Sequence, residues 1–122
     1  MNASVAIFAL LVAACQSTPV INDPSLAEVR EKRLEWNGRT VNVRGTIEGC
    51  KGEAWGCVLF TGPSDDKRSV LIIDFVPDLE PQLAAVAGRE ISLRARVTDE
   101  CARQICTDRG PDIVPLQILK VY

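Results

Sequence analysis

The chain of 122 residues contains no histidine. This absence excludes a Ser-His-Asp triad, a Cys-His dyad, zinc sites that use histidine, and haem attachment through a CxxCH motif. Aromatic residues make up 5% of the sequence, and the fourteen Lys and Arg are outnumbered by sixteen Asp and Glu. A nucleic-acid surface normally carries a basic stripe or rings on which bases stack, so the composition argues against nucleic acid as a partner. Carboxylates or lysine remain able to carry catalysis, but the commonest proton shuttle at neutral pH is missing, and we expect a non-catalytic protein without cofactor or metal ion.

The chain also lacks an apolar run long enough to cross a membrane. The run at 5–14 has ten residues, which as a helix extend about 15 Å, against about 30 Å for the hydrocarbon core of a bilayer. This length is typical of the apolar part of a signal peptide. The run ends in the letters VAAC, with Cys15 last, and this ending resembles a bacterial lipobox. The resemblance implies a signal peptide over 1–14, lipidation of Cys15 and a lipidated tether over 15–23, while a plain secreted protein and a buried apolar N-terminus stay open as alternatives.

The residue after Cys15 gives the expected location. It is Gln16 and not Asp, which by the same resemblance favours sorting to the outer membrane. We therefore expect a lipid-anchored protein of the cell envelope that faces the periplasm, with the membrane as a partner through its acyl chains. Two or more such chains hold a protein stably, whereas one holds it only marginally.

With Cys15 assigned to lipid, four cysteines remain in two close pairs, Cys50 with Cys57 and Cys101 with Cys106. An even number suits the oxidising side of a membrane, and we expect a disulfide within each pair. Pairing between the two loops, a metal site built from all four cysteines, and a thiol-redox role stay open as alternatives. Neither spacing matches the CxxC motif that is typical of zinc knuckles and of redox centres.

The periodicity of apolar residues predicts a helix followed by a β domain. Asp23 as N-cap and Pro24 as the first helical residue predict a helix over 24–36, which Asn37-Gly38 ends. Strict alternation then predicts a strand over 40–48, where Gly45 marks a bulge or a sharp coil. The remaining expected elements are strands over 57–61, 69–75, 90–97 and 113–122, and a helix over 78–88 with Asp78 as its N-cap.

This order of elements resembles the OB-fold, a small five-stranded Greek-key barrel. Residues 38–47 resemble the opening strand of OB domains, and residues 83–97 resemble the passage from the helix into the fourth strand. The resemblance spans 38–122. It implies a mainly β domain over 24–122, an OB-like barrel with an N-terminal helix and a second helix between strands 3 and 4. An SH3-like barrel is the nearest rival.

In OB domains the loop between strands 1 and 2 and the loop between strands 4 and 5 lie at one rim of the binding face. The resemblance therefore implies that candidate ligand contacts lie in these loops, namely Trp55, Arg103, Asp108 and Arg109. Packing of Trp55 over the rim, and a turn in which Asp108 and Arg109 serve the loop itself, are the structural alternatives. The polar positions of two strands carry further cations, Arg44, Arg94 and Arg96, which Glu48 and Glu90 balance, so we expect a solvated face there.

Three functions remain open on these grounds. The first is a non-catalytic envelope lipoprotein whose disulfide-stapled, OB-like barrel is a binding or scaffold module for an envelope protein or a glycan. The second is an OB protein that binds oligosaccharide or oligonucleotide through the rim loops. The third is a four-cysteine metal-binding or thiol-redox protein.

Overall fold

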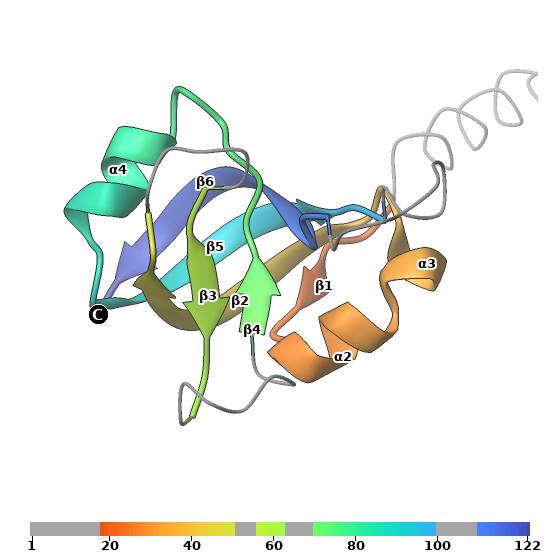
Figure 1. Cartoon of the computed structure of the whole chain (residues 1–122). Coiled ribbons are helices and arrows are strands. Elements are labelled where there is room, and N and C mark those ends of the chain that lie inside the picture. Colours follow the sequence, from red (N-terminus) through yellow and green to blue (C-terminus); the bar gives the residue numbers. More distant parts are fainter. Residues whose placement is uncertain (1–17, 51–55, 63–69, 100–109) are drawn as a thin grey trace, which may run out of the picture.

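The protein is known from a computed structural model that describes residues 18–50, 56–62, 70–99 and 110–122, and these form the mainly β domain of Figure 1. The elements in chain order are β1 (Ile21–Asn22), α2 (Leu26–Glu31), α3 (Arg33–Trp36), β2 (Thr40–Glu48), β3 (Val58–Phe60), β4 (Val70–Ile72), α4 (Glu80–Ala85), β5 (Glu90–Val97) and β6 (Ile113–Val121). Within this described part of the chain, no helix has the length and apolar character needed to cross a bilayer.

All strands belong to one sheet with the order β4-β3-β2-β5-β6, and neighbours along this path are antiparallel. Strand β1 comes from the segment expected to be tether and pairs with β2 in parallel. The two edge strands approach each other at a parallel bridge between Ile73 and Ile113. There the N–H of Asp74 donates to the carbonyl of Ile113 at 2.9 Å. Among the described residues, the sheet is open apart from this contact.

Strand β2 organises the sheet because it pairs with two partners. Its first part pairs with β5 and its last residues pair with β3, with Thr46 in both ladders. Gly45 lies inside the regular ladder with β5, so it marks no bulge. A Cβ at Gly45 would lie 2.8 Å from the carbonyl oxygen of Phe60 and 2.9 Å from Cγ of Leu59. The glycine is therefore needed for the close approach of β3 to β2.

The core lies on the inner face of the sheet and beneath the helices. The alternation predicted for residues 40–48 and 90–97 is confirmed, since inward residues of β2 and β5 are buried and most of those between them are not. Helix α2 contributes Leu26 and Val29, and α4 contributes Leu83. The buried apolar side chains are Leu26, Val29, Val41, Val43, Ile47, Cys57, Leu59, Leu71, Ile73, Leu83, Ile91, Leu93, Ala95, Val97 and Ile113.

The N-terminal helix differs from the expectation in its start and its continuity. Asp23 is not the N-cap: it takes a left-handed conformation with φ of 51°. Ser25 is the N-cap, and its hydroxyl accepts a hydrogen bond from the N–H of Glu28. Lys32, with φ of −101° and ψ of 17°, then separates α2 from α3. The predicted end is confirmed, because Asn37 is the C-cap and Gly38 has a positive φ of 85°.

Strands β2 and β5 have the predicted bounds, and the other predicted elements are present with shorter bounds. Asp78 is not the N-cap of α4, which begins at Glu80 after Leu79. No side-chain cap is needed there, because the N–H groups of Leu79 and Glu80 both donate to the carbonyl of Val76. The strand expected over 69–75 is regular only over Val70–Ile72, and Ile73, which follows it, forms a bridge with Ile113.

Asp112 forms hydrogen bonds to three parts of the domain. Its Oδ1 lies 2.7 Å from Nη1 of Arg33 in α3, and its Oδ2 accepts a hydrogen bond of 2.7 Å from the N–H of Ile72 in β4. Its backbone carbonyl accepts from the N–H of Thr98, just after β5. The Asp112 side chain is fully buried and that of Arg33 is 21% exposed. A buried carboxylate with these partners fixes the helix against the contact between the sheet edges.

Candidate functional site

The structure describes two of the residues that were expected to carry function, Cys50 and Cys57. They lie at the two ends of the loop between β2 and β3. The other predicted site residues fall outside the described part of the chain: Cys15, Trp55, Cys101, Arg103, Cys106, Asp108 and Arg109.

Cys50 and Cys57 form a disulfide with an S–S distance of 2.05 Å, so the predicted pairing within the first loop is confirmed. The antiparallel pairing of β2 with β3, in which Glu48 lies opposite Val58, brings the two cysteines close together, with a Cα–Cα distance of 4.1 Å. Their surroundings differ. Cys57 is fully buried in the core, whereas Cys50 is only partly buried against it.

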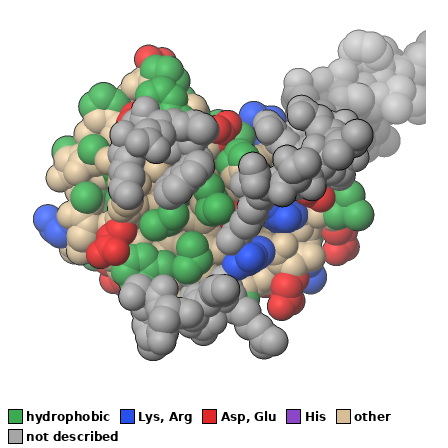
Figure 2. All heavy atoms as spheres, viewed as in Figure 1, with side chains coloured by type: hydrophobic (Ala, Val, Ile, Leu, Met, Phe, Trp, Pro, Cys, Tyr) green, Lys and Arg blue, Asp and Glu red, His purple; other side chains and the backbone are tan. Residues whose placement is uncertain are grey.

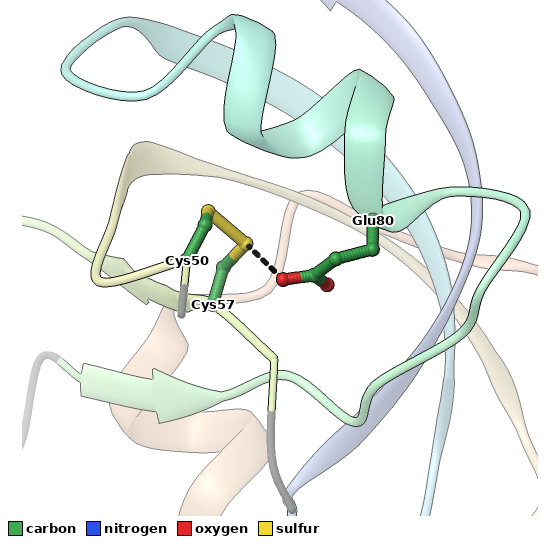
Figure 3. Close-up of side chains that lie close together, drawn as sticks. All are labelled: Cys50, Cys57 and Glu80. Carbon is green, nitrogen blue, oxygen red and sulfur yellow. Dashed lines mark hydrogen bonds between the residues drawn. A yellow bond between two sulfur atoms is a disulfide. The ribbon is translucent and has the colours of Figure 1, made fainter. Parts of the chain in front are cut away.

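The first residue of α4, Glu80, reaches from the helix toward this disulfide (Figure 3). Its Oε1 lies 3.7 Å from Sγ of Cys57. That distance suits a hydrogen bond from a thiol S–H to a carboxylate. A disulfide sulfur has no hydrogen to donate, so the contact can act as such a bond only when Cys57 is reduced.

Glu80 is buried in spite of its charge-bearing side chain, being 9% exposed. Its Oε2 has no hydrogen-bond partner among the described residues. Gly56 makes room for it: a Cβ at Gly56 would lie 2.7 Å from Oε2 of Glu80 and 3.3 Å from the carbonyl oxygen of Asp74. The carboxylate does not cap its own helix, since α4 has no side-chain cap. A buried polar atom without a hydrogen-bond partner, such as Oε2 of Glu80, is uncommon in folded proteins and often has a functional cause.

The ligand atoms of Cys50, Cys57 and Glu80 all lie within 4.8 Å of one another. Thiolates and a carboxylate are ligands that zinc accepts, but the metal-binding form of cysteine is the free thiolate. The two sulfurs are joined to each other here. This set can therefore hold a metal ion only after the disulfide has been reduced.

The described residues next to the two loops that were expected to form a rim are connected by backbone contacts. Beside the first loop, the N–H of Gly56 donates to the carbonyl of Ile73 at 2.9 Å. Ile73 in turn forms the bridge with Ile113, just beyond the second loop. Thr98, just before that loop, donates to the carbonyl of Asp112. Residues next to both loops are thus linked through Ile73, which directly follows β4, and through Asp112.

The predicted solvated face is present on the outer side of β2 and β5. Arg44 pairs with Glu90 at 3.2 Å, and both side chains are about half exposed. The guanidinium of Arg44 also lies over the ring of Tyr122, 3.7 Å from its centre. The hydrogen bond to Glu90 raises the pKa of Arg44 above its ordinary value. The part of the stability that depends on the raised pKa of Arg44 is therefore present at neutral pH and is lost as the pH rises through that pKa.

A shallow pocket of about 350 Å³ lies beside this face, at the start of α2. It is lined by Asp23, Pro24, Ser25, Leu26, Arg44 and Thr61. Basic and acidic side chains are interspersed on the face drawn in Figure 2. The lining offers one cation and one carboxylate, which does not single out a class of ligand.

In comparisons with protein-family models, curated proteins and solved structures, no match to this chain was found. The geometry of the site is therefore the sole basis on which its chemistry can be inferred. Sequence reasoning missed Glu80, because an acidic residue in the first turn of a helix is ordinary. It is separated from Cys57 by 22 residues of intervening chain, the sequence separation being 23, and no motif spacing connects the two.

Proposed function

We propose that this chain is a non-catalytic lipoprotein of the cell envelope, whose disulfide-stapled domain serves as a binding or scaffold module. The Cys50–Cys57 disulfide is the observation that carries the proposal. Disulfides persist in oxidising compartments and are rare in the cytosol. A lipidated Cys15 leaves an even number of cysteines for such bonds. The proposed location is the outer membrane, with the domain facing the periplasm.

We further propose that the domain is an OB-like Greek-key barrel. In support, the sheet order β4-β3-β2-β5-β6 returns on itself through the parallel contact of Ile73 with Ile113. Helix α4 lies between β4 and β5 in the chain, where OB domains have their helix. Fold alone defines no activity, so the module's partner is proposed only as an envelope protein or a glycan.

Lipidation is tested by growing cells with a labelled palmitate. We expect label on the wild-type protein and on a Ser17→Ala control, and none on Cys15→Ala, because the acyl chains need the thiol of Cys15. Equal labelling of Cys15→Ala would overturn the lipoprotein proposal. Partner capture by crosslinking in intact cells then tests the module: one reproducible envelope partner supports it, and the absence of any specific partner or glycan opposes it.

A second candidate function is oligosaccharide binding at the rim, with Trp55, Arg103, Asp108 and Arg109 as contacts. It is favoured by the way in which the described ends of both loops meet through Ile73 and Ile113. The net charge of −2 opposes an oligonucleotide more than a neutral glycan. On a glycan array, Trp55→Ala should lose most of the binding that the wild type shows, since ring stacking contributes strongly at such sites. Unchanged glycan affinity in Trp55→Ala would remove the basis of this candidate.

A further inference from the structure

We propose that Cys50–Cys57 is an exchangeable disulfide, with Glu80 as the group that takes the proton from Cys57 and returns it. The co-reactant is an external thiol and its disulfide. The exchange is stoichiometric and goes beyond the binding role proposed above, on which it does not depend. Its basis is the arrangement of three side chains at the start of α4: the partly exposed Cys50, the buried Cys57, and a buried carboxylate in contact with the sulfur of Cys57.

The difference in burial assigns a role to each sulfur. Exchange requires that an external sulfur reach one of the two cysteines, and access decides which. Cys57 is fully buried, whereas Cys50 is partly exposed at the end of β2. Cys50 is therefore the sulfur that forms the mixed disulfide with the external thiol. Cys57 is the sulfur that closes or leaves the internal bond.

Glu80 is positioned to accept the proton that the buried Cys57 must lose under this assignment. Cys57 must become a thiolate in order to attack, and a thiolate surrounded by apolar groups is unfavourable. A proton acceptor in contact with Cys57 relieves this by taking the proton directly from the thiol as the attack begins. Oε1 of Glu80 lies 3.7 Å from its Sγ, and the second oxygen, Oε2, has no partner among the described residues. Gly56 keeps open the space in which this carboxylate lies.

In the oxidising direction, an external disulfide first reacts with the Cys50 thiolate. A bond forms between Cys50 and one external sulfur, and the other external sulfur leaves as a thiolate. Glu80 then takes the proton from Sγ of Cys57, and the resulting thiolate attacks Sγ of Cys50. The internal S–S bond forms as the second external thiolate leaves. Two electrons have passed from the protein to the external disulfide, and reduction by an external thiol retraces these steps with Glu80 returning its proton to Cys57.

The contacts of Glu80 are not explained by a role in stabilising the oxidised fold alone. In the disulfide form the carboxylate gains no hydrogen bond from sulfur and does not cap its helix. In the reduced form the same position receives the S–H of Cys57. An acceptor left without a partner disfavours the form in which it is unsatisfied. Glu80 therefore stabilises the reduced form relative to the disulfide, which makes the staple easier to reduce by an external thiol.

The test uses the full-length chain, reduced and then mixed with oxidised glutathione, with acid quenching and mass analysis of tryptic peptides. Trypsin cuts at Lys51, so Cys50 and Cys57 lie in separate peptides, 45–51 and 52–67. We expect glutathione to appear first on Cys50 and then to be released as the internal disulfide closes. First appearance of glutathione on Cys57 would overturn the proposal, and this measurement needs no variant.

The role of Glu80 is tested by the rate of the closing step. Glu80→Gln should slow closure at least about tenfold, since a positioned proton acceptor commonly contributes more than that. Glu48→Gln is the matched control, because it removes an exposed carboxylate two residues before Cys50, and it should change the rate less than about twofold. Closure of Glu80→Gln at the wild-type rate would overturn the proposal.

Two further measurements separate this role from a structural one. The near-ultraviolet circular dichroism of each oxidised variant shows whether it is folded, and Glu80→Asp replaces Glu80→Gln if the latter is not. Glu80→Asp keeps a carboxylate but withdraws it by one methylene, so it should close faster than Glu80→Gln and more slowly than the wild type. The disulfide of Glu80→Gln should also be harder to reduce, with an equilibrium constant against glutathione shifted at least about fivefold. No shift, or one in the opposite direction, would contradict the reasoning.

Discussion

Removing the carboxylate of Asp112 should destabilise the domain by about 3 kcal/mol. In Asp112→Ala, Nη1 of Arg33 and the N–H of Ile72 lose the acceptors that lie 2.7 Å from each of them. Hydrogen bonds to a charged group contribute about 1.5–3 kcal/mol, and a buried donor without a partner costs about 1–3 kcal/mol. Because the Arg33 side chain is 21% exposed, water recovers part of this loss, and the result lies near the lower end of the range for buried pairs that lose one partner.

The assay is urea unfolding of the oxidised protein followed by tryptophan fluorescence. If the same variants are unfolded by heat instead of urea, a loss of about 3 kcal/mol corresponds to a fall in Tm of roughly 12–24 °C for a domain of this size. Asp112→Asn keeps an oxygen that accepts from Ile72 and should lose only about 1–2 kcal/mol. Asp78→Ala, at an exposed position in the chain before α4, should change stability by less than about 0.5 kcal/mol. A loss below about 1 kcal/mol in Asp112→Ala would refute this account of the junction between α3, β4 and β5.

Three other predictions concern the packing and the cysteines. Gly45→Ala should lower the free energy of unfolding in urea by about 1–3 kcal/mol, because its Cβ would overlap the carbonyl oxygen of Phe60. Gly110→Ala, whose Cβ would meet open space, should be nearly neutral. Equal effects of the two substitutions would contradict the close approach of β3 to β2. Leu83→Ala should lower the free energy of unfolding by about 2–4 kcal/mol, because the Leu83 side chain is fully buried. The control Leu116→Ala, at an exposed position, should lower it by less than about 0.5 kcal/mol. A similarly small loss in both variants would show that α4 does not pack on the core. A tryptic map without reduction should link peptides 45–51 and 52–67, and separately 97–103 and 104–109; a link between the two sets would disprove local pairing.

The parts of the fold that were predictable are those in which the pattern reflects burial. Strands β2 and β5 alternate strictly because one face meets the core and the other meets water. Strand β1 has only two residues, which is too short for an alternation of apolar and polar residues, so the sequence does not predict it. The Ser-x-x-Glu spacing of Ser25 and Glu28 is typical of a helix start, but the prediction rested on Asp23 and Pro24 and did not use it.

The chemistry of the site was less predictable than the fold because it depends on contacts between distant segments. The pairing of Cys50 with Cys57 follows from a short hairpin loop. The contact of Glu80 with Cys57 arises only when α4 packs against the start of β3. Asp112 likewise reads as one more acidic loop residue until Arg33 and Ile72 meet it from other elements.

The central claim, a disulfide-stapled envelope lipoprotein, is tested most directly by the intact mass of the protein extracted from its native membrane, measured with and without reduction and alkylation. The account predicts a mature chain that begins at Cys15, carries acyl chains, and shows four alkylated thiols only after reduction. An unprocessed chain without acyl mass, whose cysteines are alkylated before any reductant is added, would contradict it.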